Sequence, residues 1–403
     1  MATASISISK DPARPFSSRS DPLFGALYGR GEVALQASDD AWLQAMLDVE
    51  AALAHACASE GSITAEAAEA IAAACRRERF DIAELGVAAA ASATPVVPLV
   101  AALRALVGEE HERSVHLGAT SQDIIDSAAM LVAKRALAPL LADARAAADA
   151  AVELARANRD TPMTGRTLLQ QALPTSFGLR AAGWLIGIDE ALARLVEVGE
   201  TRLAVQMGGP VGTRPPEIAA LVAAELDLAL PVLPWQAIRV RVAELAGALG
   251  TLAGVLAKIA RDVTLLSADE VGEVHEGGGG AGRGGSSAMA HKRNPVAAVS
   301  LLACTTRVPG LVATLLAAMV QEHERAAGTW QSEWGTLSEL LTLVGSASAW
   351  ARELLENLEV VPQRMLDNLA RLAAAGVSEA ATPLDHLDGA LVLVDRALKA
   401  HGR

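Results

Sequence analysis

The segment 238–266, IRVRVAELAGALGTLAGVLAKIARDVTLL, decides the fold of this chain. Its apolar residues alternate spacings of four and three, at Val242, Leu245, Leu249, Leu252, Leu256, Ile259, Val263 and Leu266. This heptad pattern places one continuous apolar seam along a single long helix. Such a seam is best buried against other helices of similar length, so we expect a long-helix bundle. A plain coiled-coil stalk would fit the seam equally well, but not the polar loop that follows it.

Further helices are expected over residues 39–59, 121–158, 176–206 and 296–325, because each stretch opens with a capping residue or follows a proline. Alternation of β-branched residues never lasts more than a few positions, so no strand is expected. The predicted fold class is therefore all-α. We expect an N-terminal helical domain (1–110), a central bundle of long helices (111–350) and a C-terminal helical domain (351–403).

Composition and charge exclude several classes of partner. The formal net charge of −13 argues against nucleic acid, because binding to phosphates needs a basic face. The longest uncharged run, 85–103, contains a glycine and two prolines, so no membrane span is expected. Three cysteines without CxxC spacing, Cys57, Cys75 and Cys304, indicate buried thiols and a cytoplasmic protein. The regular heptad seam favours a homo-oligomer.

The most polar loop is 284–295, GGSSAMAHKRNP, which follows the glycine run GGGGAGR. Glycines of this density let backbone N–H groups turn toward an anion. A flexible linker is the alternative, but linkers normally continue in low-complexity sequence, whereas MAHKRNP differs at every position. Gly280, Gly282 and Gly285 match the dinucleotide pattern GxGxxG, yet a long helix precedes them where that pattern requires a strand.

Polar clusters also stand at three other helix junctions. The first is the stretch 116–123, HLGATSQD, where Thr120 and Ser121 are capping residues and the helix N-terminus would favour a bound carboxylate. The second is 165–174, GRTLLQQALP, in which flanking Gly and Thr suggest a turn that aims Arg166. The third is 322–325, EHER, together with Trp330 and Trp334. By composition alone, this last group would pass as a solvated helix end.

Metal and acyl-transfer chemistry find no support in these clusters. No spacing of His, Asp or Glu resembles a metal site, and we expect neither metal nor cofactor. The GxSxG elbow is absent, because Ser286 is followed by Ser287 and Ala288.

In three ordered motifs, HLGATSQD, GRTLLQQALPTSFG and GSSAMAHKRNP, the chain resembles the fumarase/aspartase superfamily over nearly its whole length. The resemblance implies a long-helix bundle with small flanking helical domains. It also implies homotetramers whose active sites combine residues from three subunits, and cofactor-free chemistry at a small polycarboxylate. Ser286 matches the catalytic residue of that superfamily. The expected substrate-binding residues are His116, Thr120, Ser121, Gln122, Arg166, Thr167, Gln171, Ser287, Met289, His291, Lys292, Asn294 and Arg325.

The second motif discriminates between members of the superfamily. Lyases of this superfamily carry His after GRT, and adenylosuccinate lyases carry a second His three residues later. Leu168 and Gln171 stand at these positions here. Together with EHERAAGTWQSEW, this motif resembles the 3-carboxy-cis,cis-muconate cycloisomerases, whose lactonisation has no leaving amine to protonate. An adenylosuccinate-lyase-like C–N lyase and a catalytically silent helical scaffold are the alternatives.

Two departures from the pattern bear on this expectation. Ala290 replaces the proline of the loop motif, so we expect a less rigid loop. The region after residue 353 is shorter than the helical domain that family members usually carry there, so we expect part of that domain and the substrate contact it would supply to be absent.

Overall fold

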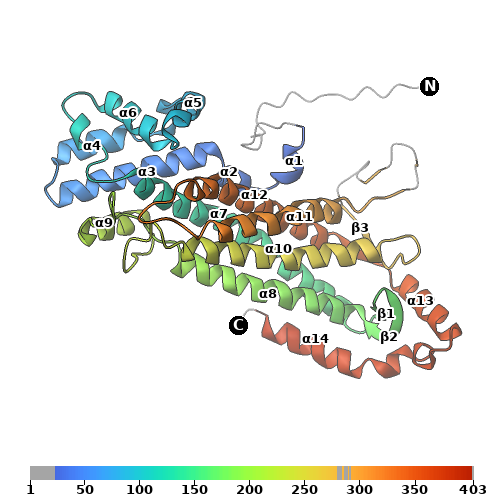
Figure 1. Ribbon diagram of the computed structural model, residues 1–403. Helices are drawn as coiled ribbons and strands as arrows, with labels where there is room; N and C mark the ends of the chain where they lie inside the picture. Colours follow the sequence, from blue (N-terminus) through green and yellow to red (C-terminus); the bar gives the residue numbers. More distant parts are fainter. Residues whose placement is uncertain (1–22, 279–283, 286–288, 290–291, 402–403) are drawn as a thin grey trace, which may run out of the picture.

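The computed structural model describes residues 23–278, 284–285, 289 and 292–401. Its centre is a bundle of long, mostly antiparallel helices (Figure 1). They are α7 (Ser121–Ala157), α8 (Phe177–Thr201), α10 (Val240–Leu266), α11 (Val296–Ala317) and α12 (Thr329–Glu356). The expected all-α class and long-helix bundle are confirmed.

The heptad seam of α10 lies in the middle of this bundle, packed against α8, α11 and α12. Leu245, Leu249, Leu252 and Leu256 have no exposed surface. Burying one Leu side chain stabilises a fold by about 1.5–3 kcal/mol, so the seam supplies a large part of the driving force for bundle formation. The periodicity of the sequence thus predicted the central helix within two residues at its start.

By length and apolar composition, α10 and α11 could each cross a membrane. Half of the most apolar window of α10 is buried inside the bundle, and 39% of that of α11. Both helices pack in the bundle, α10 against α8, α11 and α12, and α11 against α10 and α12.

Shorter helices cover the N-terminal end of the chain. They are α1 (Gly25–Tyr28), α2 (Val33–Gln36), α3 (Asp39–Ser59), α4 (Ala65–Ala74), α5 (Ile82–Ser92) and α6 (Val96–Val107), with 3₁₀ turns at Arg77–Arg79 and Glu112–Ser114. The bounds of α3 are those expected, because the Ser38 side chain caps it by accepting a hydrogen bond from the N–H of Ala41. Between α8 and α10, α9 (Pro216–Leu226) packs on α3.

The expectation of no strand was wrong at two places. Strands β1 (Pro162–Thr167) and β2 (Gln170–Ser176) form an antiparallel hairpin between α7 and α8. A second pair joins β3 (Val274–Glu276) to β4 (Leu358–Val360) across the sequence. The hairpin has a bulge between Thr164 and Arg166, and Pro162 and Pro174 interrupt its alternation, so the sequence carries no regular strand pattern.

Two expected helix ends were also wrong. The helix expected to run to residue 206 ends at Thr201. The helix expected to run to residue 325 ends at Ala317, and the polar segment 318–328 crosses the end of the bundle before α12 begins. Arg325 therefore lies in a connecting segment, where its side chain can turn toward α7.

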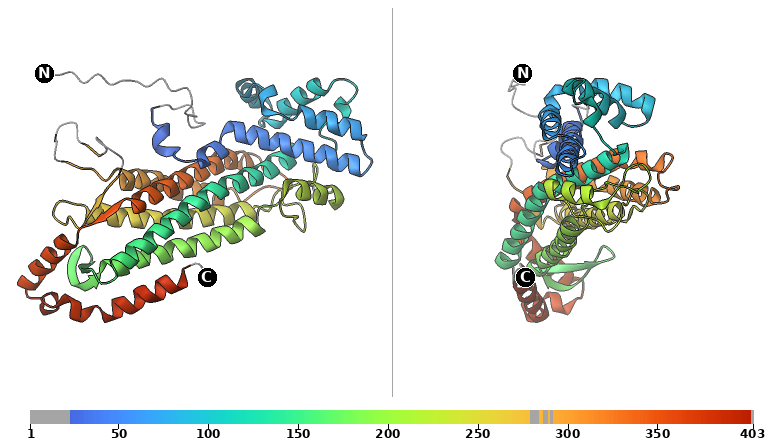
Figure 2. Two further views of the ribbon diagram at one scale, coloured as in Figure 1. Left: turned by 180° about the vertical axis from the view of Figure 1, so that it is seen from behind. Right: turned by 90° about the vertical axis from the view of Figure 1, so that its left-hand side faces the viewer.

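The C-terminal part folds back along the bundle. It consists of α13 (Pro362–Ala374), 3₁₀ turns at Ser378–Ala380 and Pro383–His386, and α14 (Asp388–Ala400). Figure 2 shows α14 lying beside α7 and α8, on which it packs. Arg159 forms a bidentate ion pair with Asp395 at 2.6 and 2.7 Å, which fixes α14 to the end of α7. The division into three domains stays a prediction, and its boundary at residue 350 falls inside α12.

Candidate active site

The start of α7 is fixed by a capping box. The Thr120 side chain accepts from the backbone N–H of Asp123, and the Asp123 carboxylate accepts from the N–H of Thr120. Asp123 also accepts the N–H groups of Gly208 and Gly209, both at 2.9 Å. Burial raises the pKa of Asp123, and these donors act in the opposite direction. The first turn is thereby tied to the connection between α8 and α9.

Three of the predicted substrate-binding residues meet at this turn. Arg325 donates from Nη2 to Oγ1 of Thr120 at 2.5 Å and from Nε to Oε1 of Gln122 at 3.3 Å. Gln122 is buried and also donates to the carbonyl of Gln236 at 2.6 Å. Arg325 and Thr120 remain partly accessible, so a cation and a hydroxyl face solvent beside the positive end of a helix. This arrangement suits a carboxylate.

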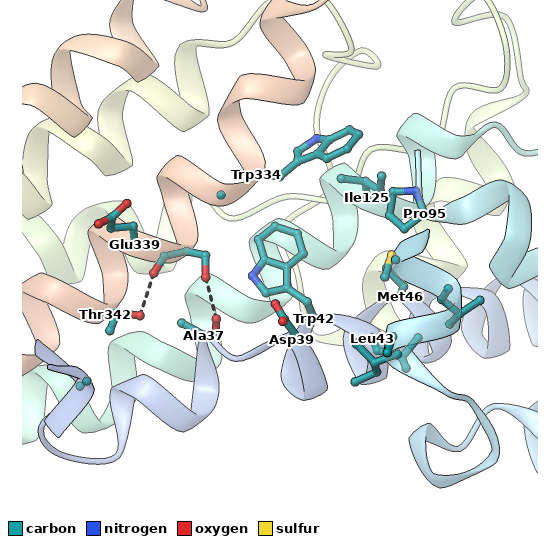
Figure 3. Close-up of a pocket in the computed structure, with 18 of the residues that line it drawn as sticks. Ala37, Asp39, Trp42, Leu43, Met46, Pro95, Ile125, Trp334, Glu339 and Thr342 are labelled. Atoms are coloured by element: carbon teal, nitrogen blue, oxygen red, sulfur yellow. Dashed lines mark hydrogen bonds between the residues drawn. The ribbon is translucent and has the colours of Figure 1, made fainter. Parts of the chain in front are cut away.

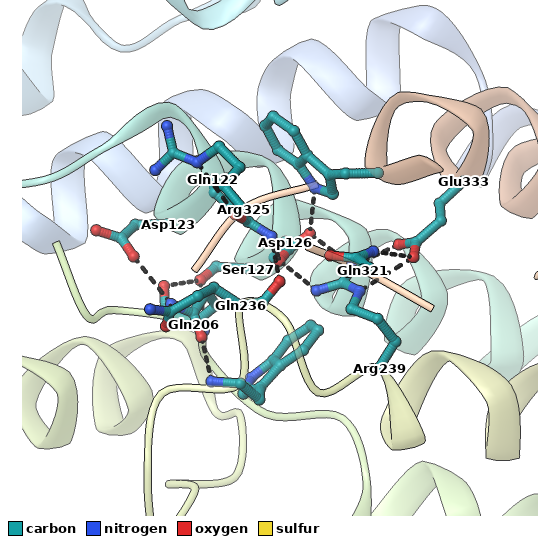
Figure 4. A network of polar contacts seen from close by, with 12 residues as sticks. Gln122, Asp123, Asp126, Ser127, Gln206, Gln236, Arg239, Gln321, Arg325 and Glu333 are labelled. Carbon is teal, nitrogen blue, oxygen red and sulfur yellow. Dashed lines mark hydrogen bonds and ion pairs between the residues drawn. The ribbon is translucent and has the colours of Figure 1, made fainter. Parts of the chain in front are cut away.

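A buried ionic network underlies the turn (Figure 4). Arg239 binds Asp126 through both terminal nitrogens, at 2.6 and 3.0 Å, and binds Glu333 through Nε at 3.0 Å. Trp330 donates its indole N–H to Asp126 at 3.0 Å. Burial alone would lower the pKa of Arg239, but the two carboxylates together raise it. All four side chains are buried, so the network holds α7, α10 and α12 in fixed relative positions.

His116 stands four residues before Thr120 in the sequence, and its Nδ1 lies 2.6 Å from Oε1 of Glu50 on α3. Ser121, the remaining predicted residue of the first motif, is partly buried at the first position of α7.

The second motif forms the tip of the β1–β2 hairpin. Thr167 and Gln171 are exposed there, on either side of the two-residue turn Leu168–Leu169. Arg166 does not point freely into solvent, because Nη1 and Nη2 donate to the two carboxylate oxygens of Glu273 at 2.9 and 2.7 Å. Glu273 has no exposed surface and also accepts from Asn368 of α13.

The third motif connects β3 to α11. Ser286, Ser287 and His291 lie outside the described residues. Lys292 and Met289 are exposed, and Asn294 holds the loop closed by donating its side-chain amide to the carbonyl of Gly284 at 3.0 Å.

The base of the same loop is fixed by Glu276. Its carboxylate accepts the N–H groups of Ala297 and Ala298 at 2.9 and 2.8 Å, at the first turn of α11. The carboxylate therefore occupies the positive end of this helix, where two N–H groups would otherwise lack a partner. Both ends of the third motif are thus anchored to regular elements.

These groups of residues lie at opposite ends of the bundle. Thr120, Gln122 and Arg325 lie at the start of α7, whereas the hairpin follows its end and the loop precedes α11 at that same end (Figure 1). Helix α7 has 37 residues, which corresponds to a length of about 55 Å. One chain therefore does not bring the three motifs together.

A cavity of about 1150 Å³ lies elsewhere, between α3, α5 and α12 (Figure 3). Trp42, Trp334 and Ile125 line it, and its described lining residues include none of the predicted site residues. Ile125 directly precedes Asp126 of the buried network on α7. Among the described residues, no group of three or more His, Cys, Asp or Glu is placed to hold a metal ion.

Sequence patterns did not predict the buried carboxylates that support these motifs. Glu273 and Glu276 stand in the short stretch EVHE just before the glycine run, and Asp126 stands four residues after Gln122. The spacing of Gln122 and Asp126 was the one available signal, because residues four apart share a helix face. The partners of the two glutamates come from distant parts of the sequence.

Comparisons with known proteins agree with this architecture. Residues 16–310 match the model of the lyase family. The 3-carboxy-cis,cis-muconate cycloisomerase of Pseudomonas aeruginosa is 47% identical over 89% of this chain and 80% of its own length. Nitrosuccinate lyase of Streptomyces davaonensis is 42% identical over 89% of this chain and 80% of its own length.

The solved structure of 3-carboxy-cis,cis-muconate lactonizing enzyme from Pseudomonas putida superposes with a TM-score of 0.85 at 36% identity. The match covers 94% of this chain and 99% of that chain. The chain therefore belongs to the lyase family of the fumarase/aspartase superfamily, within the group that contains the 3-carboxy-cis,cis-muconate cycloisomerases.

Proposed function

We propose that this protein is a 3-carboxy-cis,cis-muconate cycloisomerase that forms 4-carboxymuconolactone in the breakdown of protocatechuate. The observation that carries the proposal is the 47% identity to an enzyme of that name over 89% of the chain. The hairpin tip agrees with it, since Leu168 and Gln171 occupy the positions where lyases of the superfamily carry the imidazole acid.

Lactonisation joins a carboxylate oxygen of the substrate to one carbon of its own C=C bond. The neighbouring carbon, α to an activating carboxylate, then takes up a proton, so the product carries one negative charge fewer than the substrate. Between these events an enolate-like charge develops on the activating carboxylate. The reaction therefore needs N–H or cationic groups at that carboxylate and a proton donor beside the carbon.

We assign these roles by position in the motifs. Ser286 is the proton donor, and Lys292 with Asn294 stabilises the developing charge. A second carboxylate of the substrate binds at the start of α7, where Arg325 and Thr120 present a cation and a hydroxyl at 2.5 Å from each other.

The remaining predicted residues divide into two groups. Further substrate contacts are assigned to Thr167, Gln171, Ser287, Met289 and His291. Ser121 and Gln122 complete the carboxylate-binding residues at the start of α7. Arg166 has both terminal nitrogens on Glu273, which favours a role in orienting the hairpin over direct contact with substrate.

We further propose that the active enzyme is a cytoplasmic homotetramer with sites shared between copies. The separation of the motifs along the roughly 55 Å of α7 supports sharing, because a second copy must supply what one chain holds at its far end. Exposed apolar side chains on α11 and in the segment that follows it support association, among them Val299, Leu316 and Val320, which are 53%, 48% and 80% exposed.

Loss of the conjugated diene absorbance of 3-carboxy-cis,cis-muconate tests the activity directly. Ser286→Ala should abolish turnover while the protein stays folded and oligomeric, and the exposed Ser378→Ala serves as the matched control. Near-normal kcat in Ser286→Ala would place the proton donor elsewhere.

A second candidate is C–N bond cleavage, favoured by the 42% identity to nitrosuccinate lyase. Consumption of nitrosuccinate and of adenylosuccinate, each measured beside 3-carboxymuconate, separates this reaction from lactonisation. Turnover of nitrosuccinate or adenylosuccinate without turnover of 3-carboxymuconate would overturn the cycloisomerase assignment. Turnover of none of the three compounds would favour a silent scaffold.

A further inference from the structure

A buried glutamate on α3 holds the histidine of the first motif. Oε1 of Glu50 lies 2.6 Å from Nδ1 of His116, and the Glu50 side chain has no exposed surface, whereas that of His116 is 14% exposed. The other carboxylate oxygen of Glu50 is buried without a hydrogen-bond partner among the described residues. Burying a carboxylate with one oxygen unsatisfied costs stability, so packing alone does not explain Glu50.

His116 itself has an unfavourable backbone conformation. Its φ is +61°, in the left-handed region that glycine or asparagine occupies more easily. Strain of this kind is concentrated at functional sites. The chain thus keeps an imidazole at a position where the backbone disfavours it.

The neighbours of His116 fix the loop from several elements. Arg214 donates to the carbonyl of Leu117 at 2.9 Å, and Arg104 of α6 donates to the carbonyl of Val115 at 3.4 Å. Because Nδ1 faces Glu50, the other ring nitrogen, Nε2, is the one left for a ligand. Four residues further along the chain, Thr120 receives the hydrogen bond of Arg325.

We propose that Glu50 is a positioning residue that orients His116 so that Nε2, together with Arg325 and Thr120, binds a carboxylate of the substrate. A carboxylate on Nδ1 fixes the orientation of the imidazole ring, so Nε2 is held in one direction and adds a contact to that of Arg325 at a site for a polyanion. This inference rests on the proposed polycarboxylate substrate, and it assigns to Glu50 a role that acts only through His116.

The test measures binding as well as turnover. Glu50→Gln keeps the shape and an acceptor oxygen but removes the charge, and we expect KM for 3-carboxymuconate to rise about tenfold or more, as the loss of a charge-assisted hydrogen bond predicts. We expect kcat to stay within about threefold of wild type, because the lost contact binds the substrate and the transition state equally. Tricarballylate, a tricarboxylate that does not lactonise, should lose affinity by the same factor in calorimetry.

The double mutant tests whether Glu50 affects binding only through His116. His116→Asn, which suits a positive φ, should cost as much affinity as Glu50→Gln, and adding Glu50→Gln to it should cost nothing further. The matched control is Glu225→Gln. Glu225 of α9 pairs at 2.8 Å with His55, which lies on α3 as Glu50 does, and both side chains of this pair are exposed. Loss of this pair should leave KM unchanged.

Two binding results would overturn the proposal: tricarballylate affinity within twofold of wild type in His116→Asn, or additive losses of affinity in the double mutant. A fall in kcat at constant KM would overturn it as well. If wild type turns over neither 3-carboxymuconate nor the lyase substrates, the proposed function fails, but the tricarballylate measurements still decide the role of Glu50.

Discussion

Glu273 binds both terminal nitrogens of Arg166, at 2.7 and 2.9 Å, although the glutamate side chain has no exposed surface. The pair joins the β1–β2 hairpin to the residue that precedes β3, and Asn368 extends the contact to α13. A single buried carboxylate therefore joins the second motif to the residue before β3, the strand that leads to the third motif at the same end of the bundle.

Replacing Glu273 tests this connection. Glu273→Gln leaves the Arg166 guanidinium without its buried counter-charge, and removal of one partner of a buried ion pair typically costs about 3–5 kcal/mol. We expect a loss of that size in the free energy of unfolding, measured in urea. Glu153→Gln is the control, since its pair with Arg156 is exposed on both sides and should change stability by less than about 1 kcal/mol. Equal effects of the two variants would refute a special role for Glu273.

The heptad seam makes a prediction about stability. Leu252 has no exposed surface in the middle of α10, so Leu252→Ala should destabilise the protein by about 2–5 kcal/mol through lost burial and the cavity left behind. Leu106→Ala on α6, where the side chain is 42% exposed, should cost much less. Chemical denaturation of both variants gives the comparison, and a small loss for Leu252→Ala would mean that the seam is not the core.

The hairpin tip makes a prediction about association. Leu168 and Leu169 are 95% and 78% exposed and both have positive φ, in a two-residue turn that suits Asn-Gly. Replacing them with Asn and Gly should relieve backbone strain and remove apolar contacts to another copy. We expect weaker self-association in sedimentation velocity without loss of helical content. Val87→Asn, a 79% exposed position on α5, is the control. Unchanged association of the tip variant would show that the tip lies outside the subunit interface.

The docking of α14 should depend on pH. The hydrogen bond from His401 to Asp189, at 2.9 Å, is the main cause that raises the pKa of His401 above 6.5, and Asp149 on α7 adds to it. Because the folded state holds this proton more tightly, the stabilisation is complete below pH 6.5 and is lost as the pH rises through the raised pKa. The difference in urea midpoint between wild type and His401→Gln should therefore shrink from pH 6 to pH 9. A difference that is constant over this range would contradict the linkage.

Periodicity and capping are local properties, and they were sufficient for the main helices. The spacing of Leu245 to Leu266 predicted α10, and the cap at Ser38 set the start of α3 as expected. The three polar motifs likewise stood out from the Ala- and Leu-rich background, because a buried apolar bundle has few other reasons to carry them.

Partners distant in sequence were decided only by the tertiary structure. The fold brings Glu273 to Arg166 over 107 residues and Glu50 to His116 over 66, and neither glutamate carries a local signal. The hairpin was not predicted for the same reason. Pairing between β1 and β2 stabilises it, although the apolar alternation within each strand is irregular. The sequence by itself determined where the long helices form and where the polar motifs stand, because both depend on near neighbours. Only the tertiary structure decided that these residues lie at two ends of a long helix, because helix packing sets distances that no sequence spacing records.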